Sequence, residues 1–308
     1  MKTYIPIGLF LALLLLLPVT GDTYVLRLGT IACMYAVLAA SWNVMGGLAG
    51  YPSFATASFF GLGAYTGGLM MVNGWPLVLG MLAAGLLAFV FAFVLGVILL
   101  RLKGHYFAIA SLATVEVLRE VANSATGITG GGMGLNVPRV ADISVLGEAT
   151  IIFYVMWGLL LITAVAGLVI EKTKLGFGLT CIRQNEQAAE TSGLNTMLYK
   201  ALAFGLSAIM CAMAGSLYAA WVAYIEPGDV FDILYTIKPV VMALIGGVGS
   251  TIGAVLGAFV YIGIEEIVWR NFLEASTGLL GVLIVGLLLF LPRGLASIGR
   301  LRRYLSHA

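Results

Sequence analysis

Apolar runs of about 20 residues recur from one end of this chain to the other, and such a run is long enough to cross the hydrocarbon layer of a bilayer. Only 10% of the 308 residues are charged, whereas a soluble domain carries roughly 25%. Too few charges remain to cover a water-soluble surface. The runs also lack the alternation of apolar and polar residues that membrane-spanning strands require. The sequence therefore predicts an all-α polytopic membrane protein.

The apolar runs predict about 8–10 transmembrane or re-entrant helices in one membrane domain that covers residues 1–308. The runs are Tyr4–Thr20, Leu28–Met45, Ser53–Val72, Pro76–Leu100, His105–Asn123, Thr150–Ile170, Leu198–Val222, Ile237–Ile245, Ile252–Trp269 and Ser276–Leu291. The eighth run is too short to cross alone and ends at the break GGVGS. We expect it to be a half-helix or a re-entrant piece, with a backbone that protein covers.

Lysine and arginine gather in one set of loops. If the N-terminus is inside and the chain crosses ten times, the inner parts hold 11 of the 16 Lys and Arg residues: Lys2, Arg101, Lys103, Lys172, Lys174, Arg183, Lys200, Arg293, Arg300, Arg302 and Arg303. The outer loops are instead rich in Asp and Glu. Because positively charged loops remain in the cytoplasm, both termini are predicted to be cytoplasmic.

The stretch CIRQNEQAAETSGLN, Cys181–Asn195, is a polar island in this apolar chain. We expect a turn over residues 175–178 and then a helix of about four turns that ends before Gly193, since glycine suits the left-handed position after a helix end. Arg183 and Glu186 stand three residues apart and are expected to pair. The polar side chains from Arg183 to Glu190 are expected to face water or a partner.

Two interpretations of this helix, residues 179–193, remain at this point. It could lie on the lipid headgroups, or it could dock on a soluble protein at the cytoplasmic side. Helices that lie on headgroups usually carry large apolar anchors and many basic residues, whereas this one has no Trp or Phe and only one basic residue, Arg183. The composition favours a docking surface.

Three ionisable residues, Glu116, Arg119 and Glu120, stand inside an otherwise apolar segment. Charge within a membrane is costly and is usually functional. Glu116 and Arg119 share a helix face and could neutralise each other, so a structural ion pair and a substrate path or gate are both open. Lys238, near the outer end of its segment, is expected to extend toward the membrane surface.

Two glycine-rich stretches stand at predicted helix ends. TGITGGGMGL contains Gly130 and Gly131 and is either a tight outer loop or a place where backbone N–H groups face an anion. GGVGS contains Gly246 and Gly247 and is either a close helix contact or a hinge.

The sequence lacks the residue patterns of several other function classes. There is no basic patch with interleaved aromatic residues, so we expect no nucleic acid partner. Cys33, Cys181 and Cys211 lack metal-ligand spacing, and no Ser/His/Asp arrangement or pair of catalytic carboxylates is apparent. We therefore expect no metal, no cofactor and no enzyme activity in this chain.

The polar island, continued through MLYKALAFGLSAIMCAMAGSLYA, resembles the LivM-type permeases of branched-chain amino acid ABC importers. In ABC importers a cytoplasmic permease helix docks on the ATPase, often with the pattern EAA-x-x-x-G. This chain has Gln187-Ala188-Ala189 and then Gly193, so a glutamine replaces the glutamate.

Three further stretches carry the resemblance, which extends over roughly residues 30–295. WNVMGGLAGYPSFATASFFGLGAYTGG is similar to a glycine-rich family segment and contains Asn43, although Ala55 and Thr56 replace the usual Gly-His. The other two are GHYFAIASLATVEVLREVANSATGITGGGMGL and ALIGGVGSTIGAVLGA.

The resemblance implies a permease subunit in a bacterial inner membrane, next to a second, LivH-type permease. Two ATPase subunits would use ATP in place of any cofactor held here, and an external binding protein would deliver the substrate. The expected ATPase-coupling residues are Arg183, Gln184, Asn185, Glu186, Ala188, Ala189 and Gly193. The expected residues of the substrate path or gate are Asn43, Glu116, Arg119, Gly130, Gly131, Gly246 and Gly247.

The substrate stays open at this stage. Related permeases carry branched-chain or other amino acids, urea or short amides. The alternative to an ABC importer is a secondary transporter that acts alone, with a coupling-ion site around Glu116.

Overall fold

The computed structural model of the chain describes residues 14–140, 144–271 and 281, and these residues are almost entirely helical. The elements are η1 Leu17–Thr20, α2 Thr23–Trp42, the π-helix η2 Asn43–Leu48, α3 Thr56–Val72, α4 Leu77–Leu99, α5 His105–Ser124, α6 Thr126–Thr129, η3 Gly131–Met133, β1 Leu135–Asn136, α7 Val145–Lys172, α8 Lys174–Gln184, α9 Glu186–Thr191, α10 Thr196–Val222, β2 Tyr224–Ile225, α11 Pro227–Val230, α12 Leu234–Gly246 and α13 Thr251–Asn271. Most of the first predicted run and nearly all of the last, Ser276–Leu291, lie outside the described residues.

Five of the described helices are long and apolar enough to cross a membrane. They span Thr23–Leu48, Leu77–Leu99, Val145–Lys172, Thr196–Val222 and Thr251–Asn271. Each coincides with a run predicted from the sequence, with ends that differ by a few residues. The prediction of an all-α polytopic membrane protein is confirmed.

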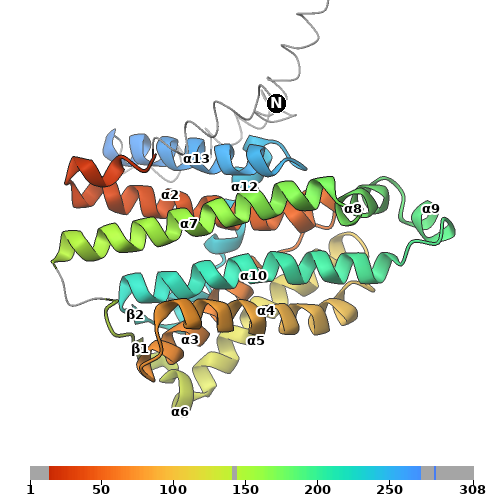
Figure 1. Ribbon diagram of the computed structural model, residues 1–308. Coiled ribbons are helices and arrows are strands. Elements are labelled where there is room, and N and C mark those ends of the chain that lie inside the picture. The colour runs from red at the N-terminus through yellow and green to blue at the C-terminus, as the bar shows by residue number, and fades with distance from the viewer. Residues whose placement is uncertain (1–13, 141–143, 272–280, 282–308) are drawn as a thin grey trace, which may run out of the picture.

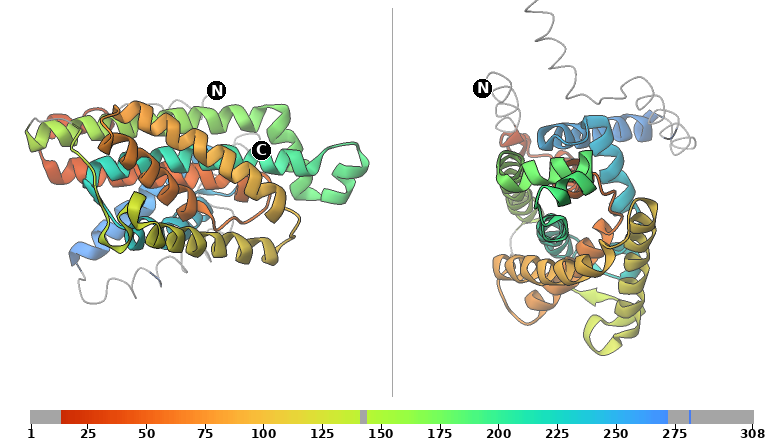
Figure 2. Two further views of the ribbon diagram at one scale, coloured as in Figure 1. Left: turned by 90° about the horizontal axis from the view of Figure 1, so that it is seen from below. Right: turned by 90° about the vertical axis from the view of Figure 1, so that its right-hand side faces the viewer.

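Helix α10 lies at the centre of the bundle. It packs on α3 and α4 on one side and on α2 and α7 on the other, and α13 covers the far side of α2 (Figure 1). The end-on view in Figure 2 shows the same order of layers. Helices α8 and α9 project beyond one end of the bundle, which we call the α9 end. At the opposite end, β1 and β2 pair antiparallel, with Leu135 opposite Ile225.

Glycines bring α3 and α10 into close contact. A Cβ atom at Gly215 would lie 2.0 Å from the carbonyl oxygen of Phe60, and one at Gly63 would lie 2.1 Å from that of Ala212. No larger side chain fits at either position without moving the backbone. Small residues at membrane helix contacts give this kind of close packing, which explains why α10 can be buried among so many neighbours.

Helices α3 and α12 both begin inside the bundle. The hydroxyl of Thr236, near the start of α12, accepts a hydrogen bond from the Ala57 amide at 3.0 Å and donates to the carbonyl of Phe54 at 3.2 Å. Thr236 is fully buried. The short run predicted at Ile237–Ile245 is therefore a helix of 13 residues that begins against α3, with its irregular backbone covered by protein as a membrane interior requires.

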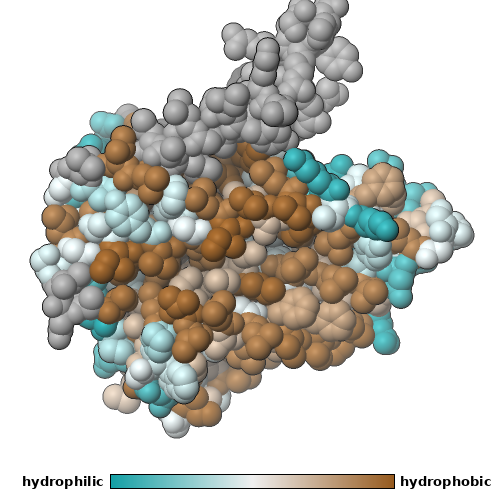
Figure 3. Space-filling view, viewed as in Figure 1, coloured by the Kyte–Doolittle hydropathy of each residue, from teal (hydrophilic) through white to brown (hydrophobic). Residues whose placement is uncertain are grey.

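The long sides of the bundle are apolar. Helix α4 exposes Val78, Leu82, Leu86 and Val94, each by more than half of its surface, and α7 exposes Val165 in the same way. Figure 3 shows a broad brown, apolar area along this side of the bundle, with teal, polar residues at the α9 end. This surface is suited to lipid along its sides and to water at its ends.

Candidate functional site

The projecting polar segment is two helices rather than one. The expected turn over residues 175–178 lies inside α8, and the expected single helix of residues 179–192 breaks at Asn185. Asn185 is extended, with φ −161° and ψ 104°, and its side chain accepts a hydrogen bond from the Ala188 amide at 3.1 Å. Asparagine favours this capping role at a helix start, so a new helix begins there. Gly193 has φ +86° directly after α9, and this prediction is confirmed.

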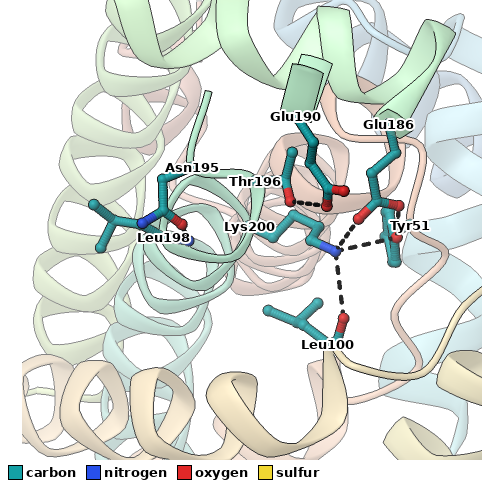
Figure 4. A network of polar contacts seen from close by, with 8 residues as sticks. All are labelled: Tyr51, Leu100, Glu186, Glu190, Asn195, Thr196, Leu198 and Lys200. Carbon is teal, nitrogen blue, oxygen red and sulfur yellow. Dashed lines mark hydrogen bonds and ion pairs between the residues drawn. The ribbon is translucent and has the colours of Figure 1, made fainter. Parts of the chain in front are cut away.

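A buried lysine on α10 holds α9 in place. The ammonium of Lys200 donates to Oε1 of Glu186 at 2.6 Å, to the hydroxyl of Tyr51 at 3.2 Å and to the carbonyl of Leu100 at 3.3 Å (Figure 4). An ammonium has three N–H donors, and here each one has an acceptor. The Lys200 side chain is 3% exposed. One charge therefore ties α9 and α10 to the end of α4 and to the loop that contains Tyr51.

The Glu186 carboxylate completes this network. Its Oε2 accepts a hydrogen bond from the Tyr51 hydroxyl at 2.5 Å. Partial burial by itself raises the pKa of Glu186, but the hydrogen bonds from Lys200 and Tyr51, with the charge of Lys200, outweigh burial and hold that pKa below its usual range. Nearby, Glu190 accepts a hydrogen bond from the Thr196 hydroxyl at 2.8 Å. Helix α9 is thus fixed at both ends.

Arg183 does not pair with Glu186, and the predicted pair of these two residues is wrong. Arg183 Nη1 instead donates to the carbonyl of Gly47, in the π-helix η2, at 2.8 Å. A Cβ atom at Gly50 would lie 2.6 Å from Cγ of Arg183. Because Lys200 is buried and needs an acceptor, it takes the Glu186 carboxylate, and Arg183 is left to contact the backbone of η2.

The same end of the bundle contains Asn43 and the GGVGS break. Oδ1 of Asn43 accepts a hydrogen bond from the Gly249 amide at 2.8 Å, and Asn43 is fully buried. A Cβ atom at Gly246 would lie 1.8 Å from the carbonyl oxygen of Gly253, so α12 and α13 meet closely here, and Gly247 has φ +112°. Arg183 also lies close to Gly249 of this break, which binds Asn43, so three of the predicted path residues lie in the same region of the bundle as Arg183. Their role as a gate stays a prediction.

A second acidic residue links the end of α7, just before α8, to α13. Oε1 of Glu171, at the end of α7, accepts hydrogen bonds from both the amide and the hydroxyl of Thr251, each at 2.6 Å. Thr251 is the first residue of α13. We therefore expect a displacement of α8 and α9 to displace α2, α4, α10 and α13 as well.

The outward side of α8 and α9 has no contact of this kind. Gln184, Asn185, Ala188 and Gly193 are exposed, whereas Ala189 is buried and Glu186 is turned inward. Phe177 on α8 is 73% exposed. The predicted coupling residues therefore divide into an outward group, suited to contact another protein, and an inward group that fixes the helices to the bundle.

The other predicted path residues lie elsewhere. Glu116 and Arg119 form the predicted ion pair, with 3.3 Å between the charged atoms, and both side chains are exposed on α5. The amides of Gly130 and Gly131 donate to Thr126 and Thr129 within their own loop, so these two N–H groups are not free to face an anion. Within residues 14–140 and 144–271, no group of three or more His, Cys, Asp and Glu residues is placed to hold a metal ion.

Sequence patterns did not reveal Tyr51, Lys200 or the Leu100 carbonyl as parts of this site. In the sequence analysis, Lys200 was only one of the basic residues used to predict the orientation of the chain. The available signal was its position five residues inside the α10 helix, where a lysine must find a buried partner or reach water.

Comparison with known proteins identifies the family. The family described as "Branched-chain amino acid transport system / permease component" matches residues 24–292. The high-affinity branched-chain amino acid transport system permease protein LivM of Escherichia coli (strain K12) is 29% identical over 95% of this chain and 75% of its own length. LivM of Salmonella typhimurium is 28% identical over the same shares.

A relative with another named substrate also matches. The autoinducer 2 import system permease protein LsrC of Yersinia pestis (strain Pestoides F) is 29% identical over 75% of this chain and 68% of its own length. The search of solved structures found no match. With its membrane-spanning helices and its match over most of its length, the chain belongs to the family of branched-chain amino acid transport permease components and is a multi-pass permease of the LivM type.

Proposed function

We propose that this chain is one permease subunit of an ATP-driven importer for branched-chain or related amino acids. A second, LivH-type permease would complete the path, two ATPase subunits would drive it, and an external binding protein would deliver the substrate. ATP would be hydrolysed by the partner subunits, so this chain needs no cofactor. The names of the LivM relatives support the substrate class.

The observation that carries the proposal is the two-sided design of α8 and α9. Their outward side is polar and exposed around Gln184 and Ala188. Their inward side is held by Arg183 on η2 and by Glu186 on Lys200. A protein that pushes on such a projection moves several membrane helices at once, which is what coupling to an ATPase requires.

The charges at the α9 end of the bundle support an orientation. This end holds Arg101, Lys103, Lys172 and Lys174, all of which are exposed. Positive residues at helix ends favour the cytoplasm. We therefore place α9 and both termini in the cytoplasm of a bacterial cell, with β1 and β2 facing the binding protein.

The charged face of α5 supports a place for the second permease. Glu116 and Arg119 are exposed in this chain, and charged side chains inside a membrane usually face the bundle interior or a water-filled cavity. We place the second permease and the substrate path against this face.

The test is uptake by the full assembly in proteoliposomes. Ala188→Arg adds a bulky charge to the outward side of α9, and we expect loss of both ATPase co-purification and ATP-dependent leucine uptake. Met133→Arg is the control, because Met133 is 87% exposed at the opposite end, and it should retain ATPase co-purification. Normal uptake by Ala188→Arg, or uptake without ATPase subunits, would instead indicate a secondary transporter that acts alone.

A second substrate class is favoured by one observation, the similarity to LsrC. Competition of leucine uptake by autoinducer 2, and by urea and short amides, separates these substrates. We expect other branched-chain amino acids to compete and the remaining compounds not to compete.

A further inference from the structure

A cavity of about 1150 Å³ lies among α2, α7, α10, α12 and α13. Its described lining includes Tyr24 and Arg27 near the start of α2, Trp221 near the end of α10, and Glu266 and Trp269 near the end of α13. These helix ends lie together at the end of the bundle opposite α9 (Figure 1). None of the described lining residues belongs to α5, the helix against whose charged face we place the substrate path.

The inner part of the cavity is aromatic and apolar. The rings of Tyr35 and Tyr235 stack with centroids 6.1 Å apart, and Tyr218 meets Tyr235 edge-on at 5.8 Å. Met34 and Ile31 also line the cavity. This part can hold an aliphatic group of moderate size, as ligand pockets of this volume commonly do.

Two acidic and two basic side chains surround the aromatic part. Lys238 Nζ lies 2.8 Å from Oε1 of Glu265, and both side chains are about one-fifth exposed. The expectation that Lys238 extends to the membrane surface is therefore wrong, because it turns inward to this carboxylate. The Lys238 ammonium also lies 5.4 Å from the ring centre of Tyr35. The two charges of this pair neutralise each other, and the pair forms one wall of the cavity.

The other two charges are arranged differently. Glu266 accepts a hydrogen bond from the hydroxyl of Tyr24, and its carboxylate is 3.8 Å from Nε of Arg270, which is itself 74% exposed. The guanidinium of Arg27 lies 5.8 Å from the ring centre of Trp221. Within residues 14–140 and 144–271 no hydrogen-bond acceptor or carboxylate pairs with Arg27. Arg27 is exposed, and the described residues leave its five N–H donors to water or to a ligand.

Arg27 and Glu266 border the same part of the cavity. Tyr24 and Arg27 stand three residues apart on α2 and so share one face of that helix, and the Tyr24 hydroxyl reaches Glu266. A guanidinium binds a carboxylate or phosphate through two parallel hydrogen bonds. A carboxylate accepts from an ammonium, so the two side chains together suit a ligand with both charges.

We propose that this cavity binds a small zwitterion, with its anionic group on Arg27, its ammonium group on Glu266 and its apolar part against Tyr35 and Tyr235. Two sources share this chemistry: a free aliphatic amino acid and the headgroup of an ethanolamine phospholipid. The inference goes beyond the proposed function, which places the substrate path against α5, because no described lining residue of this cavity belongs to α5.

The experiment measures binding to the full chain alone, in nanodiscs of phosphatidylglycerol, which has no ammonium group. The probes are L-leucine and glycerophosphoethanolamine, and the quenching of tryptophan fluorescence reports on Trp221 and Trp269 in the lining. Leucinamide lacks the anion and 4-methylpentanoate lacks the ammonium, so we expect both to bind more weakly than leucine.

The variants remove one charge at a time. We expect Arg27→Gln and Glu266→Gln each to weaken binding about tenfold or more, the effect of losing a hydrogen bond to a charged group. Arg27→Lys keeps the charge without the paired donors, so its affinity should lie between those of the unaltered chain and Arg27→Gln. Arg139→Gln is the matched control, because Arg139 is exposed and is not part of the cavity lining; it should bind like the unaltered chain.

Saturable binding of either zwitterion, with the variants in the expected order of affinity, supports the site. The probe that binds identifies the source of the ligand. The proposal is overturned if neither zwitterion binds, if Arg27→Gln binds as well as the unaltered chain, or if the singly charged analogues bind equally well. Because the measurement needs no ATP and no partner subunit, its failure leaves the coupling test on Ala188 untouched.

Discussion

The ammonium nitrogen of Lys200 lies 2.6 Å from Oε1 of Glu186, and this pair joins α10, at the centre of the bundle, to α9, which projects from the bundle. The pair is nearly dry, with the two side chains 3% and 15% exposed. A contact of this kind resists separation, because either charge left alone would have to return to water or stay unpaired. Helices α9 and α10 are therefore expected to move as one unit when a partner displaces α9.

The first prediction concerns this pair. Lys200→Met and Glu186→Gln should each lower the free energy of unfolding by about 2–3 kcal/mol, since each leaves a charged partner without its main contact. The double variant should lose less than the sum of the two. Thermal unfolding in detergent measures this, with Lys174→Met as a control at an exposed lysine. Additive losses would contradict a direct interaction.

The second prediction concerns pH. The pKa of Glu186 is lowered in the folded chain, so its stabilising contribution is present above the unfolded-state value of about 4.3 and is lost as the pH falls through the lower, folded-state value. The stability difference between the unaltered chain and Glu186→Gln should hold from neutral pH to about pH 5 and shrink below about pH 4. A difference that grew on acidification would contradict this assignment.

The third prediction concerns the pair on α5. Glu116→Gln alone should reduce uptake about tenfold, because it leaves Arg119 without its partner on α5, which we expect to lie in the membrane, where an unpaired arginine costs a few kcal/mol. The double variant, with Arg119→Gln added, should retain more uptake than the single one. Uptake is measured with equal amounts of inserted protein. Equal uptake by the two variants would show that Glu116 and Arg119 do not contribute to uptake as an ion pair.

The fourth prediction concerns the contact between α3 and α10. Gly215→Ala places a Cβ atom 2.0 Å from the Phe60 carbonyl, and such overpacking costs about 1–3 kcal/mol or more. Gly158→Ala on α7 meets nothing within 4 Å and should be neutral or slightly stabilising. Thermal unfolding of the two variants compares them directly. A stable Gly215→Ala protein would mean that the two helices can separate without cost.

Features that depend on neighbours along the chain could be predicted from the sequence. The length of each apolar run gave the membrane helices α4, α7, α10 and α13, because crossing a bilayer requires a minimum number of residues in one stretch. The ion pair of Glu116 and Arg119 was predictable because residues three apart meet on a helix surface. The left-handed Gly193 was predictable for a similarly local reason.

Features that depend on distant residues were not predictable in this way. The sequence offered Arg183 as the partner of Glu186, and only the packing of α10 against α9 brought Lys200 within reach instead. Arg183 itself contacts Gly47, 136 residues away along the chain. The break of the polar helix at Asn185 was also not predicted. The capping hydrogen bond of Asn185 competes with a continuous helix, and the contact of Glu186 with Lys200 favours the break.

The sequence by itself determined that this protein crosses a membrane many times, that one polar segment interrupts the apolar runs, and which family it belongs to, because run length, charge and motif order are properties of the chain. Only the tertiary structure decided which side of that segment faces outward, which charges pair and where a charged cavity opens. Electrostatic and packing energies depend on distances in space, and those distances are set when helices far apart in the sequence come together.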